Sequence, residues 1–521
     1  MDTIDSPSPA VKKSISAAQF AQLESEILLH WSTAQYLPKD FKTLSIFDYA
    51  TNLVKKNPVH ATTNRRDEFR TFFAQKVEVL LGKKVAESVY TQLETNHSIA
   101  TAQHYVPLSP NTLNATLMMS LGYADRTETE RKNLIVLACS GVSFNNPWYP
   151  RGHLFQSLVT DAIVENQLNY FGRSLDTQPV TTSVGYNDQT RKHLEKTLLH
   201  YRSQKLIKKR ELNEIIKIFD EIYFTKEVLD QKYYIDQLTL ANFYGWQRLF
   251  TSSGVSMPNL IFFSQERVAA EALEKFHMKQ QTILHEILFN QEWHRLIYKY
   301  FDTIHCGFNL KKKQGTFLFW ATPKTTKDRV QLFAKDGVLV SPDETIKIPM
   351  TPTRISEALR NEEITPSTML TFLVLSMYYG FFLVGGLDQP TYLTQTKAAY
   401  ISLLQELGLH DEIEKCLPIV TSDGILTRPS IVFVDSQTGE RSRASLLDLL
   451  VNAKSDSWPK LLEATKHITY QEGLYRLYPE IYRDFCEHEK DPELLAITEQ
   501  DIEKFTCIDT KIPPWTVLTP F

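Results

Sequence analysis

The sequence predicts an α/β protein with a Rossmann-like parallel sheet, a helical N-terminal layer and a long helical insertion. Short, continuous apolar runs alternate with longer amphipathic segments, as expected when helices connect strands that are buried on both faces. A polar or glycine-bearing loop follows each of these runs, which is typical of strand–loop–helix units in a doubly wound sheet. The predicted strands of the sheet are 98–104, 133–139, 259–264 and 381–384.

The spacing of apolar residues and the position of proline divide the chain into six parts. Apolar residues at spacings of three and four before residue 95, and the absence of proline from 188–250, predict helices in both regions. The parts are a disordered start (1–16), the helical layer (17–95), the first half of the core (96–185), the helical insertion (186–250), the second half of the core with a small β-meander (251–440) and a helical tail (441–521).

Further elements are predicted between the strands of the core. Helices are expected at 111–121, 154–167 and 352–361, strands of the meander at 316–321, 330–333 and 337–340, and a last strand at 431–435.

Residues 364–400 give the clearest strand–loop–helix corner. Thr365-Pro366-Ser367 is a helix-start signal, and Gly380 is suited to ending the apolar helix that follows. The glycines at 385 and 386 end the next strand, before a helix at 390–400. Ligands bind at such corners in open α/β sheets. A glycine pair alone more often marks a tight turn, and without a G-x-G-x-x-G fingerprint no dinucleotide site is indicated.

The composition and charge of the chain indicate which classes of binding partner are not expected. The chain has 521 residues, 42% apolar and 23% charged, which is ordinary for a soluble globular protein. A net charge of −4 gives no electrostatic reason to expect nucleic acid. The longest apolar stretch is too short to span a bilayer, and the polar start is unlike a signal peptide, so no membrane partner is expected. Five scattered cysteines without C-x-x-C suit a reducing cytoplasm. A homodimer through the helical segments remains open.

Known catalytic and metal-binding motifs are missing. His285 and His294 are too far apart for H-E-x-x-H, so no metal ligands are predicted, and no G-x-S-x-G or P-loop lysine is found. Cys139 ends a predicted strand, where a thiol could be activated, although buried cysteines at such positions are commonly inert.

The position of polar loops along the chain indicates a binding site more strongly than any sequence motif does. Polar loops follow all four predicted strands and would emerge together at one edge of a parallel sheet. They predict a pocket with amide, imidazole and guanidinium groups and little negative charge, suited to a small polar or anionic ligand. The alternative is that these are ordinary loop residues. The loops contain Gln103 and His104; Ser140, Asn145, Asn146 and Arg151; Gln265 and Glu266; and Gly385, Gly386 and Gln389.

Four segments between residues 98 and 435 resemble those of a known enzyme family. The segments ITPSTMLTFLVLS, FFLVGGLDQPTYL and TRPSIVFVD resemble bacillithiol synthase, the cysteine-adding enzyme of bacillithiol assembly. Upstream, IATAQHYVPLSPNTLNATL resembles the family's T-G-Q-Q-x-G loop and keeps Thr101 and Gln103. The chain departs from the family at the first-loop glycines, at the loop SGVSFNNPWYPRG and at Gln389, where the family has glutamate. Lost carboxylates remove candidate general bases.

The resemblance implies an enzyme that joins an amine- or thiol-bearing amino acid to a small polar acceptor, with His104 or His153 as the acid/base group. One alternative is a binding or scaffolding protein that kept the pocket and lost the chemistry; another is a glycosyltransferase-like enzyme, for which no nucleotide signature is found. No cofactor is indicated. The implied binding residues are Thr101, Gln103, Ser140, Asn145, Asn146, Arg151, Gly385, Gly386, Gln389, Tyr392 and Arg428.

Overall fold

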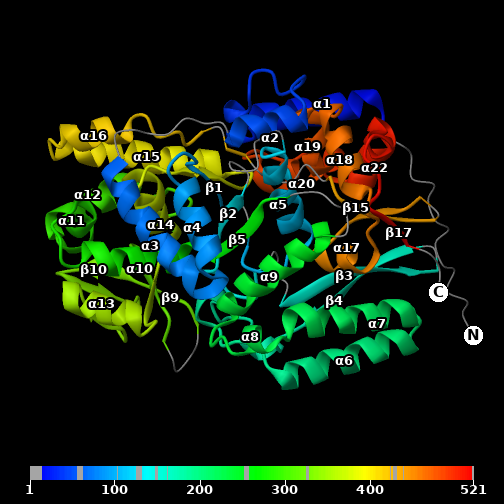
Figure 1. Cartoon of the computed structure of the whole chain (residues 1–521). Coiled ribbons are helices and arrows are strands. Elements are labelled where there is room, and N and C mark those ends of the chain that lie inside the picture. The colour runs from blue at the N-terminus through cyan, green and yellow to red at the C-terminus, as the bar shows by residue number, and fades with distance from the viewer. Residues whose placement is uncertain are drawn as a thin grey trace, which may run out of the picture.

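A four-stranded, all-parallel sheet lies at the centre of the protein (Figure 1). Its strands are β1 (Ser98–Ala100), β2 (Asn133–Ala138), β5 (Asn259–Ser264) and β14 (Phe382–Val384), in the order β14-β1-β2-β5. The predicted parallel α/β core is therefore confirmed. The computed structural model describes residues 15–54, 63–101, 104–124, 132–146, 151–160, 162–251, 257–323, 328–422, 424–425, 431–437 and 439–518.

Alternation along the strands supplies two hydrophobic cores, one on each face of the sheet. Val136 and Phe262 point into the first core, whereas their neighbours Ile135 and Ile261 point into the second. The first core is formed with α2 (Ile46–Val54), α5 (Pro110–Leu121) and most of α9 (Tyr234–Thr251). The helices of the second core include α3 (Thr63–Leu81), α4 (Lys83–Gln92), α10 (Gln265–Ala272), α14 (Thr368–Phe372) and α15 (Gln389–Glu406).

The two ends of the described chain pack against each other. In Figure 1, α1 (Ala17–His30) and α2 lie beside the helices of the C-terminal part. The contacts of α1 are with α20 (Tyr478–Phe485), and those of α2 are with α18 (Ser457–Lys466). α1 and α2 therefore form one layer with the C-terminal helices, whereas α3 and α4, which were expected in the same N-terminal layer, lie in the second core.

The helix predicted at 154–167 is wrong. The segment forms an antiparallel hairpin of β3 (Gly152–Val159) and β4 (Ala162–Asn169). Thr160, with φ of 56°, begins the turn between the strands. Exposed and buried positions alternate in the second half of β4, and this period of two is the strand pattern that the helical interpretation overlooked.

The proline-free segment that follows is helical, as predicted, but its helices have different surroundings. α6 (Asp188–Ser203) and α7 (Lys209–Ile218) lie beside the hairpin, away from the central sheet (Figure 1). After α8 (Lys226–Leu229), α9 packs directly against β5 and so belongs to the layers of the core.

The second half of the core matches most of its predicted elements. Ser367 caps α14 by accepting a hydrogen bond from the backbone N–H of Leu370, while Pro366 belongs to a short strand instead of the helix start. The helical segment ends at Gly380, which has the left-handed φ of 74° expected for this position. The meander forms two small antiparallel sheets, β10-β11-β12 and β13-β8-β9, from β8 (Phe319–Ala321), β9 (Val330–Gln331), β10 (Phe333–Lys335), β11 (Val338–Val340), β12 (Lys347–Pro349) and β13 (Ile364–Pro366).

The predicted last strand belongs to a separate sheet, β16-β15-β17, and not to the central one. No helix in the described residues is both long enough and apolar enough to cross a membrane. The remaining α-helices and strands are β6 (Phe308–Asn309), β7 (Gln314–Gly315), α11 (Ile283–Phe289), α12 (Gln291–Phe301), α13 (Pro352–Arg360), α16 (His410–Cys416), β15 (Phe433–Ser436), β16 (Arg441–Arg443), α17 (Leu446–Asn452), α19 (Tyr470–Leu474), α21 (Pro492–Leu495), α22 (Glu499–Thr506) and β17 (Thr516–Leu518).

Candidate functional site

A buried carboxylate connects the carboxyl ends of β2 and β5. Ser264 caps α10, and this places Glu266 in the first turn of the helix, facing the end of β2. Glu266 Oε2 accepts hydrogen bonds from the Ser140 backbone N–H (2.9 Å) and hydroxyl (3.0 Å). Glu266 Oε1 accepts from the Cys139 thiol (3.2 Å) and from the side-chain amide of Gln265 (3.1 Å). Glu266, one of the loop residues expected at this edge, therefore brings a buried carboxylate to a pocket for which little negative charge was expected.

His104 lies beside Cys139 at the same edge. The two residues form a parallel β-bridge between the segments that follow β1 and β2, and bridge partners project to the same face of a sheet. Both side chains are half-buried, in contrast to Glu266, which is buried. Histidine, thiol and carboxylate are thus brought together from three strand ends.

The strand order reverses direction between β1 and β14, and this is where open α/β sheets bind ligands. Here the side chain of Gln389, at the start of α15, fills that position. Its Nε2 donates to Thr101 Oγ1 (2.8 Å) and to the Leu383 carbonyl (3.3 Å). Thr101 and Gln389, both implied binding residues, are therefore in contact with each other and buried.

A cavity of about 370 Å³ adjoins the start of α15 and includes Tyr392 in its lining. Asp388 also lines it, and accepts hydrogen bonds from Trp31 Nε1 (3.3 Å) and Thr33 Oγ1 (3.3 Å). Burial raises the pKa of Asp388 above its ordinary value, although these hydrogen bonds oppose the shift. His305 and Lys312 supply basic groups to the same cavity.

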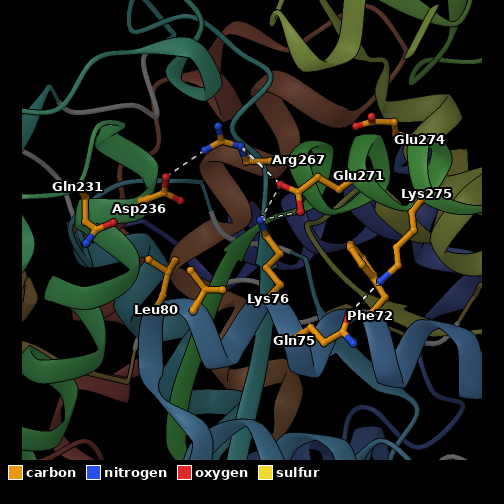
Figure 2. Close-up of a pocket in the computed structure, with 11 residues that line it drawn as sticks. Phe72, Gln75, Lys76, Leu80, Gln231, Asp236, Arg267, Glu271, Glu274 and Lys275 are labelled. Atoms are coloured by element: carbon orange, nitrogen blue, oxygen red, sulfur yellow. Dashed lines mark hydrogen bonds and ion pairs between the residues drawn. The ribbon is translucent and has the colours of Figure 1, made fainter. Parts of the chain in front are cut away.

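A second cavity, of about 640 Å³, lies beside the start of α10, next to β5 (Figure 2). Lys76 projects from α3 toward Glu271 of α10, and its ammonium group lies 2.7 Å from the carboxylate. Arg267 pairs with Asp236 at 3.1 Å and with Glu362 at 3.0 Å, and its guanidinium stacks on the ring of Tyr233 at 4.3 Å. With Glu274 and Lys275, the lining has three cationic and three anionic side chains.

The sequence analysis missed Lys76, Asp236, Arg267 and Glu271. One signal was available, because Arg267 comes directly after the strand end and the Gln265–Glu266 loop that had been singled out. Lys76 carries no such signal, since only the packing of α3 against α10 brings it to the cavity.

The other implied residues lie in several places. Arg151 pairs with Asp176 at 3.0 Å, near exposed Asn145, whose backbone N–H bonds to the carbonyl of Asp176. Asn146 is half-buried in the same loop. Gly385 pairs with Ile425 in a parallel bridge, and Gly386 follows it at the corner. Gln103 and Arg428 lie outside the described residues.

His153 lies on β3 within an aromatic cluster. Its Nε2 is 2.6 Å from the hydroxyl of Tyr170, and its ring contacts those of Phe219 and Tyr223. The side chain is buried, and this desolvation lowers its pKa to about 3. His153 therefore stays neutral in the folded protein throughout the physiological range.

Acidification is expected to destabilise the fold through His153. The unfolded chain takes up a proton on this residue below about pH 6.5, whereas the folded chain does so only near pH 3. Stability should fall as pH decreases between these values, by up to about 1.4 kcal/mol per pH unit. In urea unfolding from pH 7 to 4.5, His153→Gln should show a shallower loss than wild type. The exposed His193→Gln serves as the control, and equal slopes for His153→Gln and wild type would contradict the prediction.

Neither the models of known protein families nor the curated proteins contain a match to this chain.

Proposed function

We propose that this chain is a small-molecule biosynthetic enzyme with a Rossmann-like core, joining an amine- or thiol-bearing amino acid to a small polar acceptor. The observation that carries the proposal is the convergence of His104, Cys139 and Glu266 at the carboxyl edge of the parallel sheet. This edge is where enzymes built on such sheets place their chemistry. The resemblance of the strand-end loops to the cysteine-adding enzymes gives the reaction class.

The charged cavity beside α10 suits the amino acid. A zwitterion needs a cation for its carboxylate and an anion for its ammonium group. Arg267 and Glu271 would supply both from one helix by exchanging their present partners, Asp236 and Lys76, for the ligand. The equal number of cationic and anionic groups favours a neutral, dipolar molecule over a phosphate. At about 640 Å³ the cavity is within the range of small-molecule sites.

The buried edge supplies the acid/base groups. The Glu266 carboxylate already accepts the thiol hydrogen of Cys139, so it is placed to take a proton there. Gln265 Oε1 is buried and has no hydrogen-bond partner among the described residues, which leaves an acceptor for a donor group of a ligand. His104, half-buried beside Cys139, is the second candidate acid/base group at this edge.

One observation favours the alternative of a non-catalytic binding protein. The Thr101–Gln389 pair fills the position between β1 and β14 where a ligand would ordinarily enter. A protein of this kind would bind the amino acid in the charged cavity and turn nothing over.

Binding of an amino acid is expected to depend on Arg267. Calorimetric titration of the standard amino acids should find at least one ligand, and Arg267→Met should weaken its binding by about 10- to 100-fold, the size of a lost charge-assisted pair. Arg267→Lys should recover part of this loss. The matched control is Arg191→Met. Arg191 lies on α6, away from this cavity, and also pairs with two carboxylates, those of Glu195 and Asp220.

The outcomes separate the proposals. If a ligand binds equally well to Arg267→Met, the charged cavity is not its site. A ligand that binds at Arg267, with no product detected by mass spectrometry after incubation with a panel of polar acceptors, would support the binding protein instead of the enzyme.

A further inference from the structure

A glutamate and two histidines converge at the junction of α1 with the segment that follows α20. Glu26 and His30 lie one turn apart on α1, and His488 approaches them from a position more than 400 residues later. Both imidazoles direct Nε2 at the same carboxylate oxygen, Glu26 Oε2, at 3.4 Å from His30 and 3.0 Å from His488. The two rings stack with centroids 4.0 Å apart and an angle of 18° between their planes.

These distances match the separation between neighbouring ligand atoms around a bound metal ion. Zinc binds histidine nitrogen and carboxylate oxygen at about 2.0–2.2 Å, so two neighbouring ligands of a tetrahedral ion lie about 3.3–3.5 Å apart. The three candidate ligand atoms all lie within 4.8 Å of one another. One ion can reach all three atoms once the two imidazole rings rotate out of their stack, because each ring binds a metal in its own plane.

The donor set also has the right chemistry. Two imidazoles with one carboxylate are a known zinc set, and three protein ligands leave the fourth position for water or another group. The three side chains are only partly buried, with exposures of 32% for His30, 31% for Glu26 and 17% for His488, so an ion can enter from solvent. A plain hydrogen-bonded cluster, with both imidazoles donating to Glu26, is the competing explanation, and it predicts no stoichiometric metal binding.

We propose that Glu26, His30 and His488 bind a Zn²⁺ ion that ties the first helix to the C-terminal part of the chain. The site is separate from the charged cavity and does not depend on the proposed reaction. The sequence neighbours of two of these ligands reach the cavity of about 370 Å³. Trp31, which follows His30, donates a hydrogen bond to Asp388 in the lining of that cavity, and Glu487, which precedes His488, lines the cavity itself. Metal binding would hold both chain segments at one wall of the cavity.

The test uses full-length protein stripped of metal with a chelator. Titration with Zn²⁺ should show one equivalent bound, and Zn²⁺ should raise the melting temperature. Co²⁺, used as a spectroscopic probe, should give the visible absorption of a low-symmetry site. His488→Asn and Glu26→Gln should each weaken binding by about tenfold or more while circular dichroism shows an intact fold.

A matched control is available in the same chain. Glu463 and His467 form an exposed pair with the same four-residue spacing and a 3.0 Å contact, but they belong to no described three-ligand group. His467→Asn should therefore leave Zn²⁺ binding and the melting-temperature shift unchanged. If folded wild-type protein binds no Zn²⁺, or if one equivalent still binds with full affinity to His488→Asn and Glu26→Gln, the site does not exist.

Discussion

Gly385→Ala is expected to destabilise the protein by about 2–4 kcal/mol, because a Cβ at this position would overlap the carboxamide of Gln389. That carboxamide cannot easily move aside, since Gln389 is buried and hydrogen-bonded to Thr101 and to the Leu383 carbonyl. The backbone adds no strain of its own, as φ of Gly385 is not positive. The loss therefore measures close packing at the corner between β14 and α15.

Gly386 provides the control in the next position. A Cβ built on Gly386 meets nothing within 4 Å, and its φ is not positive either, so Gly386→Ala should change stability by less than about 1 kcal/mol. Urea unfolding with linear extrapolation compares the two variants directly. Equal midpoints would mean that the Gln389 side chain relocates without cost, and the packing argument would be withdrawn.

Glu266→Gln is expected to lower turnover by about 10²–10⁴-fold, the usual cost of removing a general base. The substitution keeps size but replaces one carboxylate oxygen with an NH₂ group. This group would face either the donors of Ser140 or those of Cys139 and Gln265, so a cost of about 1–3 kcal/mol in stability is also expected. The two effects are measured separately, by product formation and by urea unfolding.

Cys139→Ser tests whether Cys139 reacts with the substrate or only positions the carboxylate of Glu266. A serine hydroxyl still donates to Glu266, so stability should be nearly retained. If Cys139 acts as a nucleophile, Cys139→Ser loses turnover as severely as Glu266→Gln; if Cys139 only positions Glu266, turnover survives. Full activity of Glu266→Gln with the amino acid and acceptor that wild type uses would remove Glu266 from the reaction.

The central sheet could be predicted because its strands have local sequence signals, namely short apolar runs or flanking glycines. Residues 133–138 and 259–264 are apolar runs buried on both faces, and the strand at 382–384 lies between two glycines. The hairpin at 152–169 was missed because its apolar residues also fit helical spacing, and register with a partner strand decides between the two. Strand ends could thus be located better than the elements that pack around them.

The site was predictable only where it coincides with strand ends. Thr101, Ser140 and Gln389 lie at the edge that the sequence indicates. The approach of Lys76 to Glu271, almost 200 residues away, is a result of helix packing and has no local signature. The same holds for His488 and Glu26, which no spacing rule could have paired.

The packing of α1 against α20 has a consequence for synthesis on the ribosome. Leu23 and Ile27 are buried in the native protein, and the helix that α1 packs against is completed about 450 residues later. At about 5–20 residues per second, translation needs on the order of 20–90 s to cover that interval. Throughout this interval the apolar side of the first helix lacks its native cover, so the nascent chain exposes apolar surface of the kind that promotes aggregation.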